Sequence, residues 1–436
     1  MNLPFAKHTL DNGLDVLLHE DHSCPIVAVN VWYHVGSKDE RPGRTGFAHL
    51  FEHLMFEGSA HYDRGYFTPL QEAGAAVNGS TNTDRTNYWE VVPTNALELA
   101  LWMESDRMGY LLPALTREKF ENQRDVVLNE RRQNYENRPY GFAAIATMGA
   151  LYPPDHPYHW LTIGSARDLL AAEIEDVRAF FRTYYHPANA SLALAGDIDP
   201  QCAFELASRY FGEIERAPDD RPTVEVPAAR LTTDVRLSLQ DRVELPRLYL
   251  AWHTPALFAE GDAALDLLAE VLANGKTSRL YRTLVYDHRI ATEVGAAQNS
   301  RELSSYFQLV ATAAPGRDLI DIERTIVEEL DRVAQSGVTD EELGRVRAQA
   351  EAQFVFRLQT VGGFGGKSDQ LNAYNVFVGD PGYFSLDLER YRNVTGDMMR
   401  SAAAACLERH TRVSVSVVPH GRMDLALPGS SPAVVG

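Results

Sequence analysis

Two histidines stand four residues apart in the segment HLFEH, at His49 and His53, with Glu52 between them. Residues four apart on an α-helix lie one above the other, so both imidazoles can reach one metal ion. Neutral imidazole nitrogens suit zinc, and a catalytic zinc has three protein ligands and an open position for water. The segment therefore predicts a zinc site that still needs a third ligand, although so short a pattern also arises among ordinary surface or core histidines.

The third ligand has to come from another part of the chain, and residues 120–139, FENQRDVVLNERRQNYENRP, read as a helix with several carboxylates. Glu130 follows the apolar residues 126–128, which would pack this helix inward. Glu121 and Glu136 compete with it, because a carboxylate on a charged helix usually faces solvent. The residues alone favour Glu130 and leave the other two open.

The sequence around the histidines predicts the elements that hold them. Residues 25–37, PIVAVNVWYHVGS, are typical of a strand, and residues 47–56, FAHLFEHLMF, of an amphipathic helix. The second half repeats this order with the strand PRLYLAWHT at 246–254 and the helix AALDLLAEVLANG at 263–275. This repeat indicates an internal duplication, in which the second copy keeps the apolar frame and lacks the histidines.

The last elements of the two halves also match, because a helix at 174–185 precedes a strand at 190–198, as 397–410 precedes 411–421. Strand hairpins with runs of helix and no regular βαβ alternation predict an α+β fold in each half, an antiparallel sheet flanked by helices. Proline and charge gather between Glu213 and Thr233, as in a linker. The predicted parts are a metal-binding half at 1–215, a linker at 216–233 and a metal-free half at 234–436.

Composition excludes several classes of function. The net charge of −19 and pI near 5.2 would repel nucleic acid and anionic lipid, so neither is an expected partner. The three cysteines are far apart, which argues against a disulfide framework or a thiolate metal site. Neither an apolar membrane span nor an export signal is recognisable, so we expect a soluble protein, cytoplasmic by default and periplasmic if this is a trimmed mature form.

The stretch GSKDERPGRTGFAHLFEHLMFEGS at 36–59 resembles the active-site region of the pitrilysin family, zinc peptidases with the inverted His-x-x-Glu-His order. In that family the third ligand is a glutamate in a helix resembling RDVVLNE, about 75 to 80 residues after the second histidine. Here the separation is 130 − 53 = 77 residues. The resemblance therefore implies one zinc per chain, bound by His49, His53 and Glu130, with Glu52 as the catalytic base of an endopeptidase.

The resemblance covers nearly the whole chain, including NGSTNTDRTNYWEVVP, HPYHWLTIG and TSRLYRTLV. It implies two homologous halves with the LuxS/mitochondrial processing peptidase-like metallohydrolase fold. It also implies a chamber for peptides or small unfolded proteins, formed with a second, related subunit. Asn78, Gly79, Ser80 and Thr81 resemble the edge strand on which the family binds substrate by β-augmentation, although Asn-Gly is also a common hairpin turn.

Two departures from the family pattern bear on activity. Gln123 stands where members often carry a second glutamate near the metal. Val285 and Thr292 stand where active members supply an arginine and a tyrosine to polarise the scissile carbonyl. These residues favour a heteromer whose partner supplies the missing pair, with a homodimer or a non-catalytic core subunit of a larger complex as alternatives.

Overall fold

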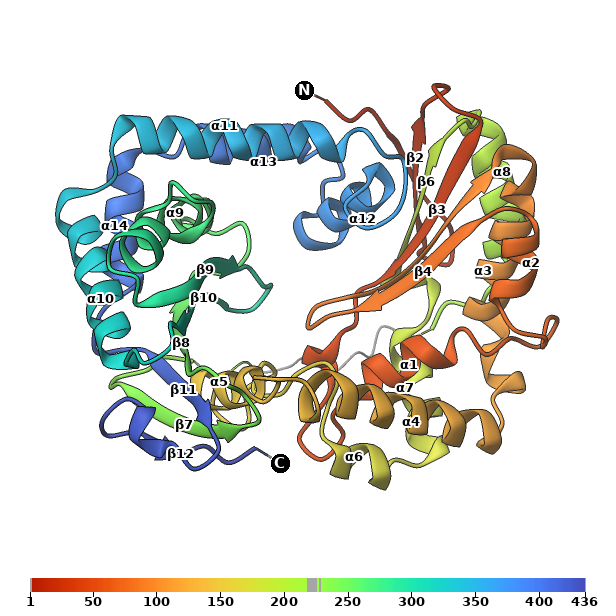
Figure 1. Ribbon diagram of the computed structural model, residues 1–436. Helices are drawn as coiled ribbons and strands as arrows, with labels where there is room; N and C mark the ends of the chain where they lie inside the picture. Colours follow the sequence, from red (N-terminus) through yellow and green to blue (C-terminus); the bar gives the residue numbers. More distant parts are fainter. Residues whose placement is uncertain (1, 218–225, 227–228, 436) are drawn as a thin grey trace. The chain divides into compact units, whose positions relative to one another are not determined.

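The computed structural model describes residues 2–217, 226 and 229–435 (Figure 1). The chain forms two compact units, each built from three segments. The first unit contains residues 1–129, 162–225 and 353–387, and the second contains residues 130–161, 226–352 and 388–436. Of the predicted linker at 216–233, residues 218–225 and 227–228 lie outside the described residues, and the predicted domain boundaries stay a prediction.

The first unit contains a mixed sheet whose strand order is β1-β2-β6-β3-β5-β4. Its strands are β1 Ala6–Thr9, β2 Asp15–Glu20, β3 Ile26–Tyr33, β4 Ala76–Thr81, β5 Thr86–Pro93 and β6 Ala190–Gly196. Among the described strands of this sheet, only the β2/β6 pair is parallel, and the other pairs are antiparallel. The central strand β3 is buried from residue 27 to residue 33, which explains its nearly continuous apolar sequence.

The second unit contains a sheet with the order β12-β7-β11-β8-β10-β9. Its strands are β7 Val235–Asp241, β8 Arg247–Thr254, β9 Ala291–Asn299, β10 Ser305–Ala313, β11 Val413–Pro419 and β12 Ser431–Pro432. The parallel pair β7/β11 occupies the place of β2/β6, and β8 occupies the place of β3. The predicted α+β class and the duplication are therefore confirmed by strand order.

Helices cover both faces of the first sheet (Figure 1). Helices α3 and α8 contact strands β2, β3 and β5 from one face, while α12 contacts β2, β3 and β6 from the other. The helices of this unit are α1 Phe47–Leu54, α2 Phe67–Glu72, α3 Leu97–Ala114, α4 Arg117–Arg131, α6 Ala166–Ala171, α7 Ile174–Tyr184, α8 Pro200–Phe211, α12 Lys367–Val378 and α13 Phe384–Arg392. Helices α4 and α13 continue across a unit boundary at their carboxyl ends.

The second sheet separates two hydrophobic clusters. Leu248, Leu250 and Trp252 of β8 join the cluster formed with α9, α10 and α14, whereas Tyr249 and Ala251 point to the cluster that includes α5. This alternation is the period of two expected of a strand. The helices of this unit are α5 Ala143–Leu151, α9 Asp262–Ala273, α10 Leu319–Ser336, α11 Asp340–Arg357 and α14 Gly396–Cys406. No helix in the described part of the chain has the length and apolar character needed to span a bilayer.

Candidate metal centre

The helix that carries both histidines, α1, is fixed at its start by a buried carboxylate. Glu40 accepts hydrogen bonds from the backbone N–H groups of Gly46 (2.9 Å) and Ala48 (2.8 Å). Two of the amide groups that a helix start leaves without intrahelical partners are thereby satisfied. Gly46 itself has φ 91°, a left-handed conformation that favours glycine. Glu40 was not singled out from the sequence, because a cap six residues away follows none of the usual capping spacings.

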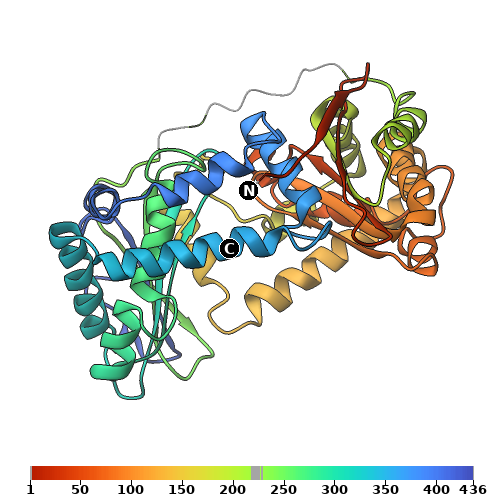
Figure 2. The same ribbon diagram turned by 90° about the horizontal axis from the view of Figure 1, so that it is seen from above.

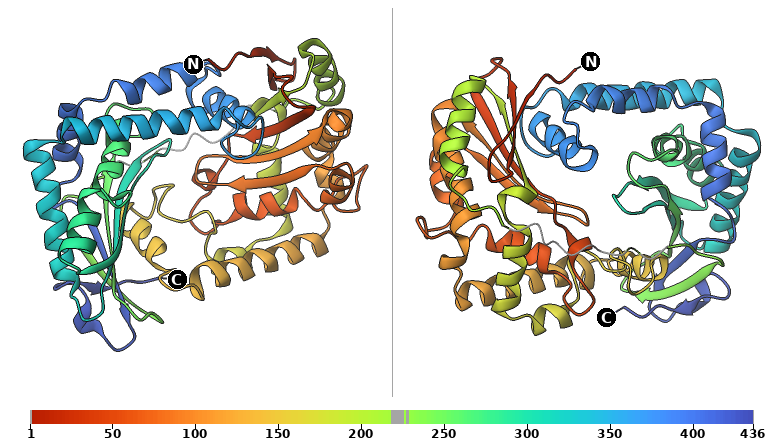
Figure 3. Two further views of the ribbon diagram at one scale, coloured as in Figure 1. Left: turned by 45° about the horizontal axis from the view of Figure 1, so that its top comes forward. Right: turned by 180° about the vertical axis from the view of Figure 1, so that it is seen from behind.

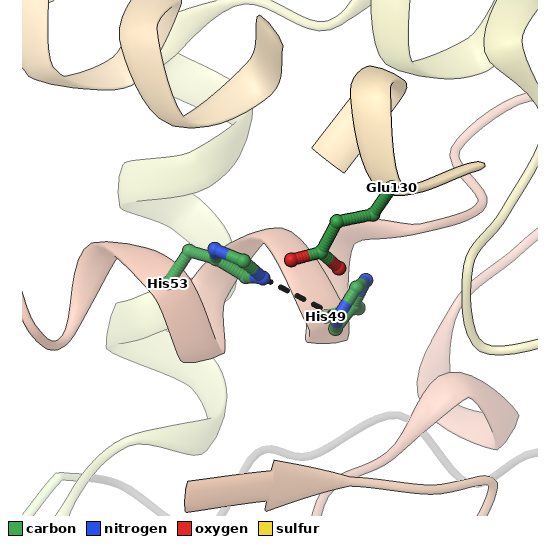
Figure 4. Close-up of side chains that lie close together, drawn as sticks. All are labelled: His49, His53 and Glu130. Carbon is green, nitrogen blue, oxygen red and sulfur yellow. Dashed lines mark hydrogen bonds between the residues drawn. The ribbon is translucent and has the colours of Figure 1, made fainter. Parts of the chain in front are cut away.

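The structure brings His49, His53 and Glu130 together (Figure 4). His49 and His53 lie one helical turn apart on α1, and Glu130 lies in the last turn of α4, a long helix (Figure 2). One ligand atom from each residue lies within 4.8 Å of the other two. The Glu130 carboxylate points toward both imidazole rings.

The spacing of these atoms fits a tetrahedral zinc ion. The Nε2 atoms of His49 and His53 are 3.4 Å apart. Zinc–nitrogen bonds of about 2.0 to 2.1 Å at a tetrahedral angle place two nitrogens about 3.3 to 3.4 Å apart. Two neutral imidazoles and one carboxylate are also a donor set found in catalytic zinc sites, where a fourth position stays open.

Electrostatics keep His49 available as a ligand. Burial and, to a smaller extent, the nearby charge of His53 together lower the pKa of the His49 imidazole to about 4. The His49 ring is therefore neutral at pH 7 and offers a nitrogen lone pair, which metal coordination requires.

The two competing glutamates are engaged elsewhere. Glu121 pairs with Arg117 at 3.6 Å, and Glu136 pairs with Arg131 at 3.3 Å. Neither belongs to the candidate metal group that the described residues form. The geometry thus selects Glu130, as the resemblance did, from three carboxylates that the residues alone left open.

Glu52, the predicted base, is half-buried on α1 next to His53. Burial lowers the pKa of the Arg85 guanidinium, and the negative charges of Asp369, Glu52 and Asp84 offset part of that shift. Arg85 lies in the turn between β4 and β5, so the charge of Glu52 acts on a residue of this hairpin. Arg85 was not predicted from the sequence.

Gln123, which replaces a glutamate of the family pattern, forms a hydrogen bond with a residue near the histidine helix. Its side-chain amide donates a hydrogen bond to the carboxylate of Glu57, just beyond the end of α1. Glu57 lies four residues after His53. The bond therefore ties the carboxyl end of α1 to α4, the two helices that carry the candidate ligands.

Residues Asn78–Thr81 form part of an edge strand and not a turn. They lie in β4, which pairs only with β5 within the described part of the sheet, and Figure 3 shows β4 beside α1. A Cβ atom on Gly79 would lie 3.0 Å from the ring of Phe56, so any larger residue there would require this ring to shift. Strand β4 is thus the outermost described strand of its sheet, the position at which β-augmentation adds a peptide.

In the second unit, the positions matched to the missing arginine and tyrosine are apolar or structural. Val285 packs against the hydrophobic cluster of β8 and α9, and the Thr292 hydroxyl donates to the carbonyl of Thr312. Arg279, which has the same seven-residue spacing to Tyr286, is held by Glu342 (2.6 Å) and Glu329 (3.0 Å). Its guanidinium is therefore committed to ion pairs within its own unit.

Two family models match the chain. One, described as insulinase (peptidase family M16), matches residues 15–145, and another, described as the peptidase M16 inactive domain, matches residues 171–350. The chain therefore belongs to the M16 peptidase family, which confirms the predicted pitrilysin-type relationship.

Similarity to individual proteins and solved structures supports this family assignment. The chain is 29% identical to a Helicobacter pylori protein named zinc protease PqqE over 358 residues, 81% of this chain and 80% of that protein. A crystal structure described as a protease from Helicobacter pylori has a TM-score of 0.89 at 26% identity, covering 96% of this chain and 100% of that one. A peptidase M16 inactive domain from Pseudomonas fluorescens has a TM-score of 0.85 at 17% identity, covering 99% and 100%, and shows the fold alone.

Proposed function

We propose that the chain is a zinc-dependent endopeptidase subunit that hydrolyses peptides or small unfolded proteins. The observation that carries the proposal is the 3.4 Å separation of the His49 and His53 Nε2 atoms, with Glu130 within reach of both. Membership of the M16 family and the name of the zinc protease relative support the same chemistry. Each chain would bind one zinc ion through these three residues.

In the proposed reaction, Glu52 is the residue that transfers protons. Zinc, when bound, supplies a Lewis acid that acidifies water and polarises the peptide carbonyl. The Glu52 carboxylate would take the proton of the attacking water and then pass it to the nitrogen of the leaving amine. Proton transfer by a positioned group contributes about 10² to 10⁴ in rate, so Glu52 should affect turnover far more than metal binding.

The test is to compare Glu52→Gln with His49→Ala in the full chain. We expect Glu52→Gln to retain zinc and to lose about 10² to 10⁴ in kcat, whereas His49→Ala should lose zinc and activity together. Zinc content by elemental analysis and cleavage of a quenched fluorescent peptide measure the two properties. Equal hydrolysis by wild type and a verified zinc-loaded Glu52→Gln would remove the proposed base.

We also propose that full activity needs a related subunit that supplies an arginine and a tyrosine. Val285 and Thr292 offer no charged or phenolic group to the scissile carbonyl, and loss of one such donor typically costs about 10² to 10³ in kcat. The purified chain should therefore gain activity when a related subunit carrying the pair is added. Full-rate hydrolysis by the chain alone would overturn this, and would favour a homodimer.

Strand β4 is proposed to bind the substrate backbone through Asn78, Gly79, Ser80 and Thr81, on the side of the strand that does not pair with β5. In β-augmentation only alternate peptide N–H groups point at the receiving strand. N-methylation of a substrate peptide should therefore weaken binding at every second residue near the cleavage site. Uniform effects at successive positions would contradict strand addition.

A non-catalytic core subunit is the second candidate. The match of residues 171–350 to an inactive domain favours it, whereas the complete set of His49, Glu52, His53 and Glu130 favours the peptidase. A chain that binds no zinc, and stays inert with every related subunit tested, would establish the non-catalytic role.

A further inference from the structure

A cavity of about 540 Å³ is lined entirely by residues of the second unit. Small-ligand sites typically enclose about 300 to 1,000 Å³, so this cavity can hold a large side chain or the end of a peptide. Residues 134–148 form one part of its wall, and residues of β8 and β10 form another. The first of these segments begins four residues after Glu130 in the sequence.

The charge of this cavity is opposite to that of the chain as a whole. Its lining contains two arginines, Arg138 and Arg247, and neither aspartate nor glutamate, although the chain has a net charge of −19. Arg138 is exposed, and within the described residues no carboxylate forms an ion pair with it. Arg138 therefore offers a guanidinium to an incoming anion at no cost of a broken ion pair.

Arg247 is the more firmly held of the two arginines. Its Nε donates to the Thr312 hydroxyl at 2.7 Å, and its guanidinium lies 3.9 Å from the centre of the Tyr140 ring. Glu293, which is outside the lining and 60% exposed, pairs with one end of the guanidinium. These contacts fix the orientation of Arg247, whose guanidinium places a positive charge in the wall of the cavity.

The lining also contains several tyrosines, among them Tyr135, Tyr140 and Tyr249. Burial raises the pKa of the Tyr135 and Tyr249 hydroxyls, so both groups stay protonated at neutral pH and can donate hydrogen bonds. Tyr140 has φ 63°, a rare conformation for a bulky residue. It is held there because its backbone N–H donates to Asp241 at 2.6 Å and its hydroxyl to the Leu245 carbonyl at 2.8 Å. Surroundings that maintain an uncommon backbone conformation are typical of binding sites.

We propose that this cavity binds a carboxylate of the peptide substrate, through Arg138 and Arg247 with tyrosine hydroxyls as further donors. The inference rests on the peptidase function proposed above and adds a preference to it. Two sources share this chemistry, namely an acidic side chain and the carboxyl terminus of a peptide. Guanidinium groups suit either one, because they form charge-assisted hydrogen bonds with carboxylates.

The test measures binding rather than cleavage, in the full zinc-loaded chain with the Glu52→Gln change. Fluorescence anisotropy would compare three versions of one labelled peptide: with an internal glutamate, with glutamine in its place, and with an amidated carboxyl terminus. We expect removal of the decisive carboxylate to raise Kd about fivefold to tenfold, as for a partly exposed charge-assisted hydrogen bond. The difference should shrink as salt is raised, because Arg138 is exposed to solvent.

Arg138→Gln should abolish the difference between the peptides, whereas Arg317→Gln, a change of an exposed arginine outside the cavity, should leave it intact. If Arg138→Gln removes the preference for the glutamate peptide over the glutamine peptide, the cavity binds an acidic side chain. If it removes the preference for the free over the amidated carboxyl terminus, the cavity binds a terminal carboxylate. Equal binding of all three peptides, or discrimination that survives Arg138→Gln, overturns the proposal. A wild-type chain that discriminates between the peptides but cleaves none of them, alone or with a related subunit, would contradict the peptidase function and leave the cavity's role as a carboxylate site standing.

Discussion

The candidate zinc site makes a sharp prediction at Glu130, because Glu130→Gln keeps the shape of the side chain and removes its charge. The structure provides three protein ligands, so the substitution removes the one anionic member. Zinc sites with four protein ligands have apparent binding free energies of about 10–16 kcal/mol, or about 2.5–4 kcal/mol per ligand. Zinc affinity should therefore fall about 10² to 10³-fold.

Competition with a chromophoric chelator at fixed pH measures this affinity. Glu121→Gln and Glu136→Gln are matched controls on the same segment, since both side chains pair with arginines and lie outside the ligand group. Each control should bind zinc as the wild type does. Wild-type affinity in Glu130→Gln, or a comparable loss in either control, would refute the ligand assignment.

Two further predictions concern stability. Arg107 is fully buried with the carboxylates of Glu104 and Glu90, so Arg107→Met should lower the free energy of unfolding by about 3–5 kcal/mol, and a loss below about 1 kcal/mol in chemical denaturation would contradict this. The hydrogen bond from Arg279 lowers the pKa of Glu342 from 4.5 to about 2. The unfolded chain then binds the extra proton, so this contribution is complete above pH 4.5 and is lost as pH falls toward 2. Urea unfolding between pH 5 and 3 should be less pH-dependent in Glu342→Gln, and an unchanged slope would count against the ion pair.

Local sequence patterns were sufficient to predict the strand and the helix nearest the histidines. The strand at 25–37 and the helix at 47–56 appear as β3 and α1, because a short apolar run and an apolar face at helical spacing are properties of short segments. Sequence pattern favoured Glu130 over the other glutamates without excluding them, since even the nearer of its two partners, His53, lies 77 residues away in the sequence. Only the family resemblance supplied that distance.

Interactions between distant segments could not be predicted in this way. The Glu40 carboxylate at the start of α1 and the Gln123–Glu57 hydrogen bond each depend on three-dimensional placement of polar residues that look solvated in sequence. The same holds for residues 353–387, which follow most of the second half in the chain and pack in the first unit. Arg138 belongs to this group as well, because its neighbours in the cavity come from β8 and β10.

The parallel pairing of β2 with β6 has a consequence for how the chain is made. Glu20 ends β2 and Ala190 begins β6, 170 residues later, and β3 also needs β6 as its neighbour. At about 5–20 residues per second of synthesis, β3 leaves the ribosome many seconds before the strand that covers its edge. Throughout that interval a highly apolar strand is open to wrong pairing, so the nascent first half is a natural client for a chaperone.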